Sequence, residues 1–228
     1  MSPNTISAKK LYLRSKMRPD IVIPKLTPFQ LMILRFRRAL LIYVLLFCWF
    51  AGDLEVNADN IIAQWDQQLF DRFYDTPPSN EPMWTIMDSI SEAGHYRSVM
   101  GLSILLMAYG DEDHQNTGKL LSSAYISAGV MTYGLKRIIR RKRPLDDTLG
   151  NPSLPSGHAT IAFSAATILG YRYPKWRIPL YIGAGLVGFS RIYLGRHYTS
   201  DVLAGAAIGT TMGVLVWHNR VTLLKWEF

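Results

Sequence analysis

The sequence predicts an all-α fold, a polytopic membrane bundle of six transmembrane helices with the N- and C-termini in the cytoplasm. Three observations support it: six apolar runs without charge, a one-sided distribution of Lys and Arg, and the composition. Hydrophobic residues make up 49% of the 228 residues and charged residues 18%, which excludes an intrinsically disordered chain. A single cysteine, Cys48, excludes an intramolecular disulfide framework and a zinc site built on cysteines.

The six apolar runs contain no Asp, Glu, Lys or Arg. They are Ala39–Gly52, Ser98–Gly110, Leu120–Leu135, Gly157–Tyr171, Ile178–Ser190 and Val202–Trp217. None reaches the roughly 18–20 residues that identify a spanning helix, and each alone also fits a buried helix of a soluble protein. Six of them leave too little polar sequence to cover a soluble helical globule, so the set favours a membrane bundle.

The chain is expected to divide into a basic cytoplasmic segment, 1–38, and a six-span domain, 39–228. Nine Lys and Arg residues precede the first run, and such an excess marks the cytoplasmic side of a membrane. Thr27-Pro28 has the pattern of a helix start, so the first helix is expected to continue from there through Gly52. The segment is too long and too basic for a typical signal peptide.

The loop 53–96 is expected on the outer face, because it holds nine acidic residues and one basic residue, Arg72. Within it, Asn57–Asp75 is predicted to form an amphipathic helix with one apolar face. That face consists of Ile61, Ile62, Trp65, Leu69 and Phe73. The helix is expected either to lie in the membrane interface or to pack on the outer end of the bundle.

The later loops agree with this orientation, with one exception. Tyr171–Arg177 and the C-terminal tail are basic and are expected inside. Lys136–Arg143, with the sequence KRIIRRKR, is placed outside by the number of crossings. Its charges therefore either contradict the topology or serve a function. The final spans are rich in small residues, as in Val202–Gly213, which permits close helix packing.

Three polar segments lie at the predicted outer ends of spans. In the first, Lys136 and Arg143 are seven residues apart and would share one face of a helix.

In the second polar segment, Ser156 is a predicted helix N-cap, and free N–H groups at such a terminus bind anions. Gly157 would let an oxyanion approach the backbone, and His158 follows it. Each segment alone also has a structural interpretation, as a basic collar or a helix start.

The third segment contains Arg191, His197 and Asp201. His197 and Asp201 are four residues apart, so they can meet across one helical turn or across a loop-to-helix junction. A carboxylate bonded to one ring nitrogen fixes the tautomer and makes the other nitrogen more nucleophilic. The pair alone would also serve as a structural cap of the sixth span.

Together the three segments predict a phosphoryl-transfer site. The cations are Lys136, Arg143 and Arg191, and the neutral donors are Ser156 and the Gly157 amide. Such a cluster suits phosphoryl oxygens that gain charge during transfer. Of the two histidines, His158 and His197, one would attack and the other would protonate the leaving oxygen. A metal site is the weaker interpretation, because three cations would repel the ion.

These segments resemble the three-part signature of the type-2 phosphatidic acid phosphatase superfamily. The matching positions are Lys136-x6-Arg143-Pro144, then Pro155-Ser156-Gly157-His158, then Ser190-Arg191-x5-His197-x3-Asp201. The resemblance implies that His197 is the nucleophile that forms a phosphohistidine, that Asp201 orients it and that His158 is the general acid. It implies as phosphate-binding residues Lys136, Arg143, Ser156, Gly157 and Arg191. It also implies that no metal or other cofactor is needed.

The predicted function is hydrolysis of the phosphate monoester or diphosphate of a lipid, of phosphatidate or phosphatidylglycerophosphate type. The alternatives with the same site are an isoprenoid (undecaprenyl) diphosphate phosphatase, a lipid A phosphatase and a phosphotransferase. A haloperoxidase is disfavoured, because six apolar spans suit a lipid substrate. The rival from another class is a non-enzymatic anion transporter, which needs polar groups near the bilayer midplane rather than at span ends.

The expected partners are the lipid phosphate and the bilayer. Nothing in the sequence indicates nucleic acid or an obligate protein partner. The expected location is a bacterial inner (cell) membrane, as an integral multi-pass protein whose site faces the periplasm or the exterior.

Overall fold

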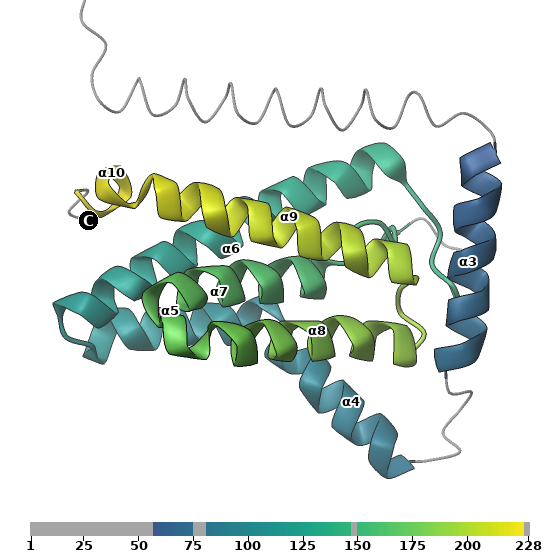
Figure 1. Cartoon of the computed structure of the whole chain (residues 1–228), viewed down its shortest axis with the longest axis horizontal. Coiled ribbons are helices and arrows are strands. Elements are labelled where there is room, and N and C mark those ends of the chain that lie inside the picture. The colour runs from purple at the N-terminus through teal and green to yellow at the C-terminus, as the bar shows by residue number, and fades with distance from the viewer. Residues whose placement is uncertain (1–56, 75–80, 147–149, 226–228) are drawn as a thin grey trace, which may run out of the picture. The chain divides into compact units, whose positions relative to one another are not determined.

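The computed structural model describes residues 57–74, 81–146 and 150–225, and within these ranges the regular structure is helical, with no strand. The helices are α3 (Asn57–Phe73), α4 (Glu81–Ala93), α5 (Tyr96–Tyr109), α6 (Glu112–Ile139), α7 (Gly157–Arg172), α8 (Arg177–Tyr193), α9 (Thr199–His218) and α10 (Arg220–Leu224), with one 3₁₀ turn, η1 (Pro174–Trp176). Figure 1 shows their arrangement. The all-helical prediction is confirmed for this part of the chain.

The last five predicted apolar runs correspond to helices α5 to α9, and only Gly110, the C-cap of α5, lies outside a helix. The first run, Ala39–Gly52, and the basic segment 1–38 lie outside the described residues. Among the described helices, only α9 is both long and apolar enough to cross a bilayer by length and composition. Helix α4 forms within the loop 53–96, where no separate helix is predicted from the sequence. The number of spans therefore stays a prediction.

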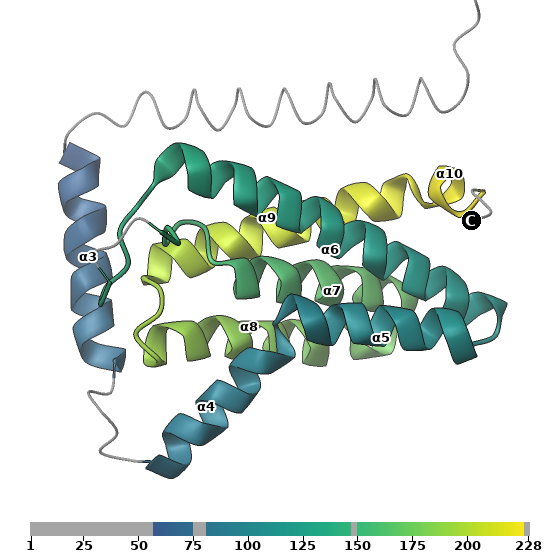
Figure 2. The same ribbon diagram turned by 180° about the vertical axis from the view of Figure 1, so that it is seen from behind.

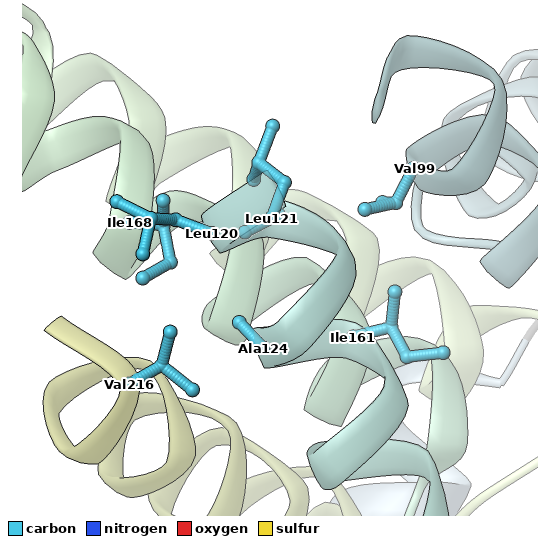
Figure 3. Packing of buried hydrophobic residues seen from close by; sticks show 8 residues of the cluster. Val99, Leu120, Leu121, Ala124, Ile161, Ile168 and Val216 are labelled. Atoms are coloured by element: carbon cyan, nitrogen blue, oxygen red, sulfur yellow. The ribbon is translucent and has the colours of Figure 1, made fainter. Parts of the chain in front are cut away.

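Helix α7 is the centre of the bundle. Helices α5, α6, α8 and α9 all pack against it, and nearly all of its side chains between Ala159 and Gly170 are buried. Figure 3 shows the main apolar cluster, which combines Val99 of α5, Leu120, Leu121 and Ala124 of α6, Ile161 and Ile168 of α7, and Val216 of α9. This shared core fixes the relative positions of α5, α6, α7 and α9, and polar segments stand at the ends of the last three of these helices.

Helix α9 approaches α7 closely through glycines spaced by four residues. A Cβ atom at Gly205 would lie 2.6 Å from the Ser156 carbonyl oxygen, and one at Gly209 would lie 2.1 Å from the Thr160 carbonyl oxygen. Neither position accepts a side chain without a backbone shift. The predicted close packing of small residues is confirmed, and it brings the start of α9 against the start of α7.

The outward faces of the bundle carry large apolar side chains. Exposed examples are Leu105 on α5, Val130 and Ile138 on α6, Ile178 on α8 and Leu203 on α9. Extended exposed apolar surface is typical of protein that faces lipid or another apolar partner. The bundle therefore has the surface expected for a protein embedded in a bilayer.

The α6–α7 and α8–α9 connections meet at one end of the bundle, because the helices α6 to α9 alternate in direction (Figure 1). The Ser156 amide joins them by donating to the Asp201 carbonyl at 2.9 Å. Figures 1 and 2 show α3 running across this end, where it contacts α8 and α9.

Helix α3 forms where the amphipathic helix Asn57–Asp75 is predicted, but the predicted apolar face is not the one that packs on the bundle. Its buried side chains include Asp66 and Phe70, whereas Ile61, Ile62 and Trp65 are exposed. The helix thus packs on the end of the bundle through a face that contains a carboxylate. Its predicted position in a membrane interface stays a prediction.

Candidate active site

The end of α6 corrects one prediction. The helix stops at Ile139, and Arg140 follows in the left-handed conformation with φ 51° and donates its amide to the Lys136 carbonyl at 3.1 Å. Lys136 and Arg143 therefore do not share a helix face. Neither glycine nor proline stands at the break, which is why the sequence pattern did not indicate it.

Lys136 and Arg143 nevertheless reach the same connection from different sides. Lys136 Nζ donates to the carbonyls of Pro152 and Ser153, the latter at 3.3 Å. Arg143 donates from Nε to the Asn151 carbonyl at 2.8 Å and from Nη1 to the Arg196 carbonyl at 3.2 Å. Burial and then the charge of Arg196 lower the pKa of Arg143. Both cations therefore help to hold the α6–α7 connection beside the start of α9.

Ser156 caps the N-terminus of α7 as predicted, but its hydroxyl does not bond to the helix. The side chain is fully buried, and its Oγ has no hydrogen-bond partner. The next residue, Gly157, has open space on its side-chain face, where a Cβ would meet only Thr132 Cγ2 at 3.9 Å. The helix terminus therefore offers a buried donor and room for a small group.

Arg191 is a second buried hydrogen-bond donor, and one of its N–H groups is not bonded. Its Nη1 donates to the Ser91 hydroxyl of α4, whereas its buried Nε has no partner. Buried polar groups without partners are rare in folded proteins, and each calls for an explanation. A tetrahedral oxyanion such as phosphate accepts from several donors at once, so both orphaned groups fit a bound phosphoryl group.

His197 and Asp201 meet across the junction between the α8–α9 connection and α9. The His197 Nδ1 and Asp201 Oδ2 atoms are 3.6 Å apart, and Ser153 bridges them. Its Oγ donates to Asp201 Oδ2 at 2.5 Å and lies 3.2 Å from His197 Nδ1. Because the hydroxyl proton is used on Asp201, the bridge assigns a proton to Nδ1, so Nε2 keeps its lone pair.

Burial keeps His197 neutral. The side chain is 2% exposed, and burial lowers the pKa of His197 to about 4, against the opposing effect of Asp201; the charge of Arg143 adds to the lowering. The Asp201 side chain is held from another side as well, because its Oδ2 accepts from the Tyr198 amide at 2.9 Å. A neutral, oriented imidazole has the properties of a nucleophile.

His158 is the second residue of α7 and is partly buried. Its ring lies edge-to-face with that of His95, with 5.2 Å between the centroids. It lies in the electrostatic reach of Arg191, His197 and Arg143. The structure thus gathers all the predicted site residues at one end of the bundle, from four helix termini and their connections.

Several residues of this end were missed by sequence reasoning. They are Asp66, Ser91, His95, Arg141 and Ser153. Arg141 lies in the basic segment Lys136–Arg143, and Asp66 lies in the predicted amphipathic helix Asn57–Asp75 but outside its predicted apolar face. Ser91, His95 and Ser153 have no signal in the sequence, because their roles come from contacts with distant segments.

Comparison with known families agrees with the geometry. Residues 117–225, which include all three polar segments, match the model of the PAP2 superfamily. The chain contains a PAP2 superfamily domain. This confirms the resemblance to the type-2 phosphatidic acid phosphatases. Asp66, Ser91 and His95 lie outside the PAP2 match.

The PAP2 match is accompanied by similarity to named bacterial proteins. The chain is 40% identical over 102 residues to a lipid A 1-phosphatase from Porphyromonas gingivalis, covering 43% of this chain and 21% of that protein. It is 39% identical over 89 residues to a decaprenylphosphoryl-5-phosphoribose phosphatase from Mycobacterium tuberculosis, covering 36% of this chain and 49% of that protein. The chain therefore spans less than half the length of these two relatives.

The fold has a solved counterpart. A transmembrane PAP2-type phosphatidylglycerolphosphate phosphatase from Bacillus subtilis superposes with a TM-score of 0.63 at 24% identity, covering 81% of this chain and 96% of that one. At this identity the likeness concerns the fold, which is that of a transmembrane PAP2 protein.

Proposed function

We propose that this protein is a metal-independent phosphatase that hydrolyses a lipid phosphate through a phosphohistidine intermediate. The observation that carries the proposal is the neutral His197, held by Ser153 and Asp201, at the same bundle end as the unpartnered donors of Ser156 and Arg191. A nucleophile beside vacant oxyanion donors is the arrangement that phosphoryl transfer needs.

The reaction has two steps. His197 Nε2 attacks phosphorus, the bond to the leaving oxygen breaks, and His158 gives its proton to that oxygen, which departs as the lipid alcohol. A water molecule then attacks the phosphohistidine, and His158 takes the proton of that water as the nitrogen–phosphorus bond breaks. The products are the lipid alcohol, or lipid phosphate from a diphosphate, and inorganic phosphate.

The phosphoryl oxygens would be bound by the predicted cation set. Lys136, Arg143 and Arg191 supply positive charge, and Ser156 and the Gly157 amide supply neutral donors. Charge develops on these oxygens in the transition state, and preorganised donors stabilise it without reorganisation. This set would supply the electrostatic stabilisation that a metal ion supplies elsewhere.

A lipid phosphate is the substrate class that fits the surroundings. The helices that carry the site expose apolar side chains to the outside, so a substrate whose tail stays in the bilayer can present its headgroup at the bundle end. We place the site at the outer face of a bacterial inner membrane, because the loop 53–96 is acidic and the flanking inner segments are basic. This assignment assumes six spans and cytoplasmic termini.

Glycerophospholipid phosphates, lipid A and isoprenoid phosphates are the three candidate substrate classes. The solved counterpart is named as a phosphatidylglycerolphosphate phosphatase, which favours phosphatidate or phosphatidylglycerophosphate. The relatives named for lipid A and for a decaprenyl-linked phosphate favour lipid A or an isoprenoid phosphate or diphosphate. The same residues would also serve a phosphotransferase, in which an acceptor lipid replaces water.

The test is phosphate release by the purified protein in detergent with EDTA present. The panel contains a dioctanoyl phosphatidate, a phosphatidylglycerophosphate, an undecaprenyl diphosphate and a lipid A, and His197→Ala is the control. We expect release from at least one lipid with EDTA present, its loss in the control, and inhibition by vanadate, which adopts the geometry of the transition state.

Two results would contradict the proposal. A rate that disappears with EDTA and returns with zinc or magnesium would contradict a metal-independent site. No release from any lipid, together with anion flux into proteoliposomes, would favour the transporter.

A further inference from the structure

Arg141 joins two acidic side chains from distant parts of the chain. Its Nη1 donates to Asp201 Oδ1 at 2.9 Å, and its Nη2 donates to Asp66 Oδ2 at 2.8 Å. The side chain of Asp201 is 0% exposed, that of Asp66 4% and that of Arg141 24%. The planar guanidinium fork suits such a double contact, which a lysine would not reproduce.

The bridge is held in place at Asp66 and at Arg141 itself. The Ser200 amide donates to Asp66 Oδ1 at 2.9 Å, and the Ser200 hydroxyl donates to Asp66 Oδ2. The Arg141 guanidinium lies over the Tyr198 ring, 4.3 Å from its centroid. Helix α3 is therefore tied by hydrogen bonds to the first turn of α9, where the partner of His197 stands.

We infer that Asp66 and Arg141 are positioning residues for the nucleophilic histidine, acting through Asp201; this rests on the proposed function. Arg141 occupies Asp201 Oδ1, so Oδ2 stays turned toward Ser153 and His197. Asp66 fixes the other half of the guanidinium and prevents Arg141 from swinging away. Without this anchor the contact to Asp201 Oδ1 weakens, only the contacts of Oδ2 with Ser153 and Tyr198 still hold the carboxylate, and the orientation of the imidazole loosens.

The bridge also sets the charge beside the nucleophile. One guanidinium lies between two carboxylates, so the buried group keeps a net negative charge next to His197. That charge stabilises the positive charge that the imidazole gains when it attacks phosphorus. The anchor Asp66 belongs to α3, outside the PAP2 match of residues 117–225, so a segment beyond the matched domain completes the site.

The experiment compares Asp66→Asn and Arg141→Gln with two matched controls. Asp71→Asn neutralises an exposed carboxylate of the same helix, and Arg137→Gln removes an exposed guanidinium near the end of α6. With the best lipid of the panel, kcat and the single-turnover rate of phosphoenzyme formation should fall about 10–100-fold in the two site variants. KM should change less than about twofold, because the loss concerns the transition state. Both controls should keep wild-type values.

Two further variants separate positioning from folding. Ser200→Ala leaves every charge of the bridge in place and should lower kcat roughly 3–10-fold. In an Asp201→Asn background, Asp66→Asn should cause less than about a twofold further loss, since its effect passes through Asp201. Size-exclusion profiles of all variants show whether each one folds.

Three outcomes would overturn the inference. The first is a wild-type kcat in both Asp66→Asn and Arg141→Gln. The second is a loss from Asp66→Asn that is equally large with and without Asp201. The third is a wild-type kcat in Ser200→Ala when the two charge variants do not fold. A wild-type protein that releases no phosphate from any lipid overturns the proposed function first, and the inference with it.

Discussion

At the scale of single residues, the two histidines have different surroundings, which suits different tasks. His197 is buried and linked through Ser153 to a carboxylate, whereas His158 lies at a helix N-terminus beside His95 and within reach of Arg191. A nucleophile needs a fixed tautomer and a stabilising carboxylate. A general acid needs access to the leaving oxygen.

We therefore expect His197→Ala to abolish both turnover and phosphoenzyme formation.

The turnover rate of His158→Ala should fall about 10²–10⁴-fold with a lipid alcohol as leaving group. The variant should still form a phosphoenzyme with p-nitrophenyl phosphate, provided that the site admits it, because that leaving group needs no proton. Asp201→Asn should keep substrate binding and lose roughly 10⁴-fold in rate.

Rapid acid quench with radiolabelled substrate, followed by peptide mapping, measures these outcomes. Label trapped on His158, or on neither histidine, would show that the roles are assigned wrongly.

The lowered pKa of His197 predicts how stability depends on pH. The folded protein resists protonation of His197 down to about pH 4, whereas the unfolded chain takes up this proton near its ordinary pKa of about 6.5. Below about pH 6.5 the unfolded state binds more protons, so the free energy of unfolding falls as pH is lowered. The neutral, buried His197 lowers the free energy of unfolding by on the order of 3 kcal/mol at pH 4, and it has no such effect above pH 7.

Denaturant titrations of wild type and His197→Asn between pH 4 and pH 8 test this dependence. Between pH 4 and pH 6.5 the free energy of unfolding of the variant should fall less steeply with decreasing pH than that of the wild type. Parallel plots of the free energy of unfolding against pH for the two proteins would mean that His197 titrates normally in the folded state.

At the scale of secondary-structure elements, the contact between α7 and α9 places the two halves of the site against each other. Gly209 allows this approach because its Cα faces the Thr160 carbonyl. Helix propensity favours alanine over glycine by up to about 1 kcal/mol. Overpacking against a backbone atom costs about 1–3 kcal/mol. This cost should exceed the gain in helix propensity, so the substitution should be destabilising overall.

Gly209→Ala is therefore expected to lower the thermal midpoint in detergent. Gly129→Ala in α6 is the matched control, since nothing lies within 4 Å of its added Cβ, and it should be neutral or slightly stabilising. Equal shifts in the two variants would mean that the α7–α9 contact is not tight.

At the scale of the whole molecule, the orientation in the membrane decides which lipids reach the site. The α6–α7 connection contains Leu145, which is exposed, and the turn at the opposite end contains the exposed Lys175. If the site faces outward, a membrane-impermeant maleimide should label Leu145→Cys in intact cells. Lys175→Cys should react only after permeabilisation.

Both variants are made after replacement of Cys48, the only cysteine of the sequence. The reverse labelling pattern would place the site in the cytoplasm, and the rule for basic loops would then hold for Lys136–Arg143.

The sequence by itself determined the helical architecture from α5 to α9 and indicated the residues of the proposed phosphoryl-transfer site. Apolar runs are local, and a segment of apolar residues satisfies its backbone groups most simply as a helix. The cations, the N-cap Ser156 and the His197–Asp201 pair could be recognised because they lie in three short segments, each with its own local pattern. The same locality made the match to a known family visible.

Only the tertiary structure decided where α6 ends and which residues contact the His197–Asp201 pair. Lys136 and Arg143 donate to carbonyls of the connection that follows α6. The helix ends before Arg140, which adopts the left-handed conformation although it is not a glycine. Ser153, Arg141 and Asp66 act on Asp201 through hydrogen bonds between segments far apart in the chain. A hydrogen bond depends on angles and on distances of about 3 Å, which only the packing of α3, α7 and α9 sets.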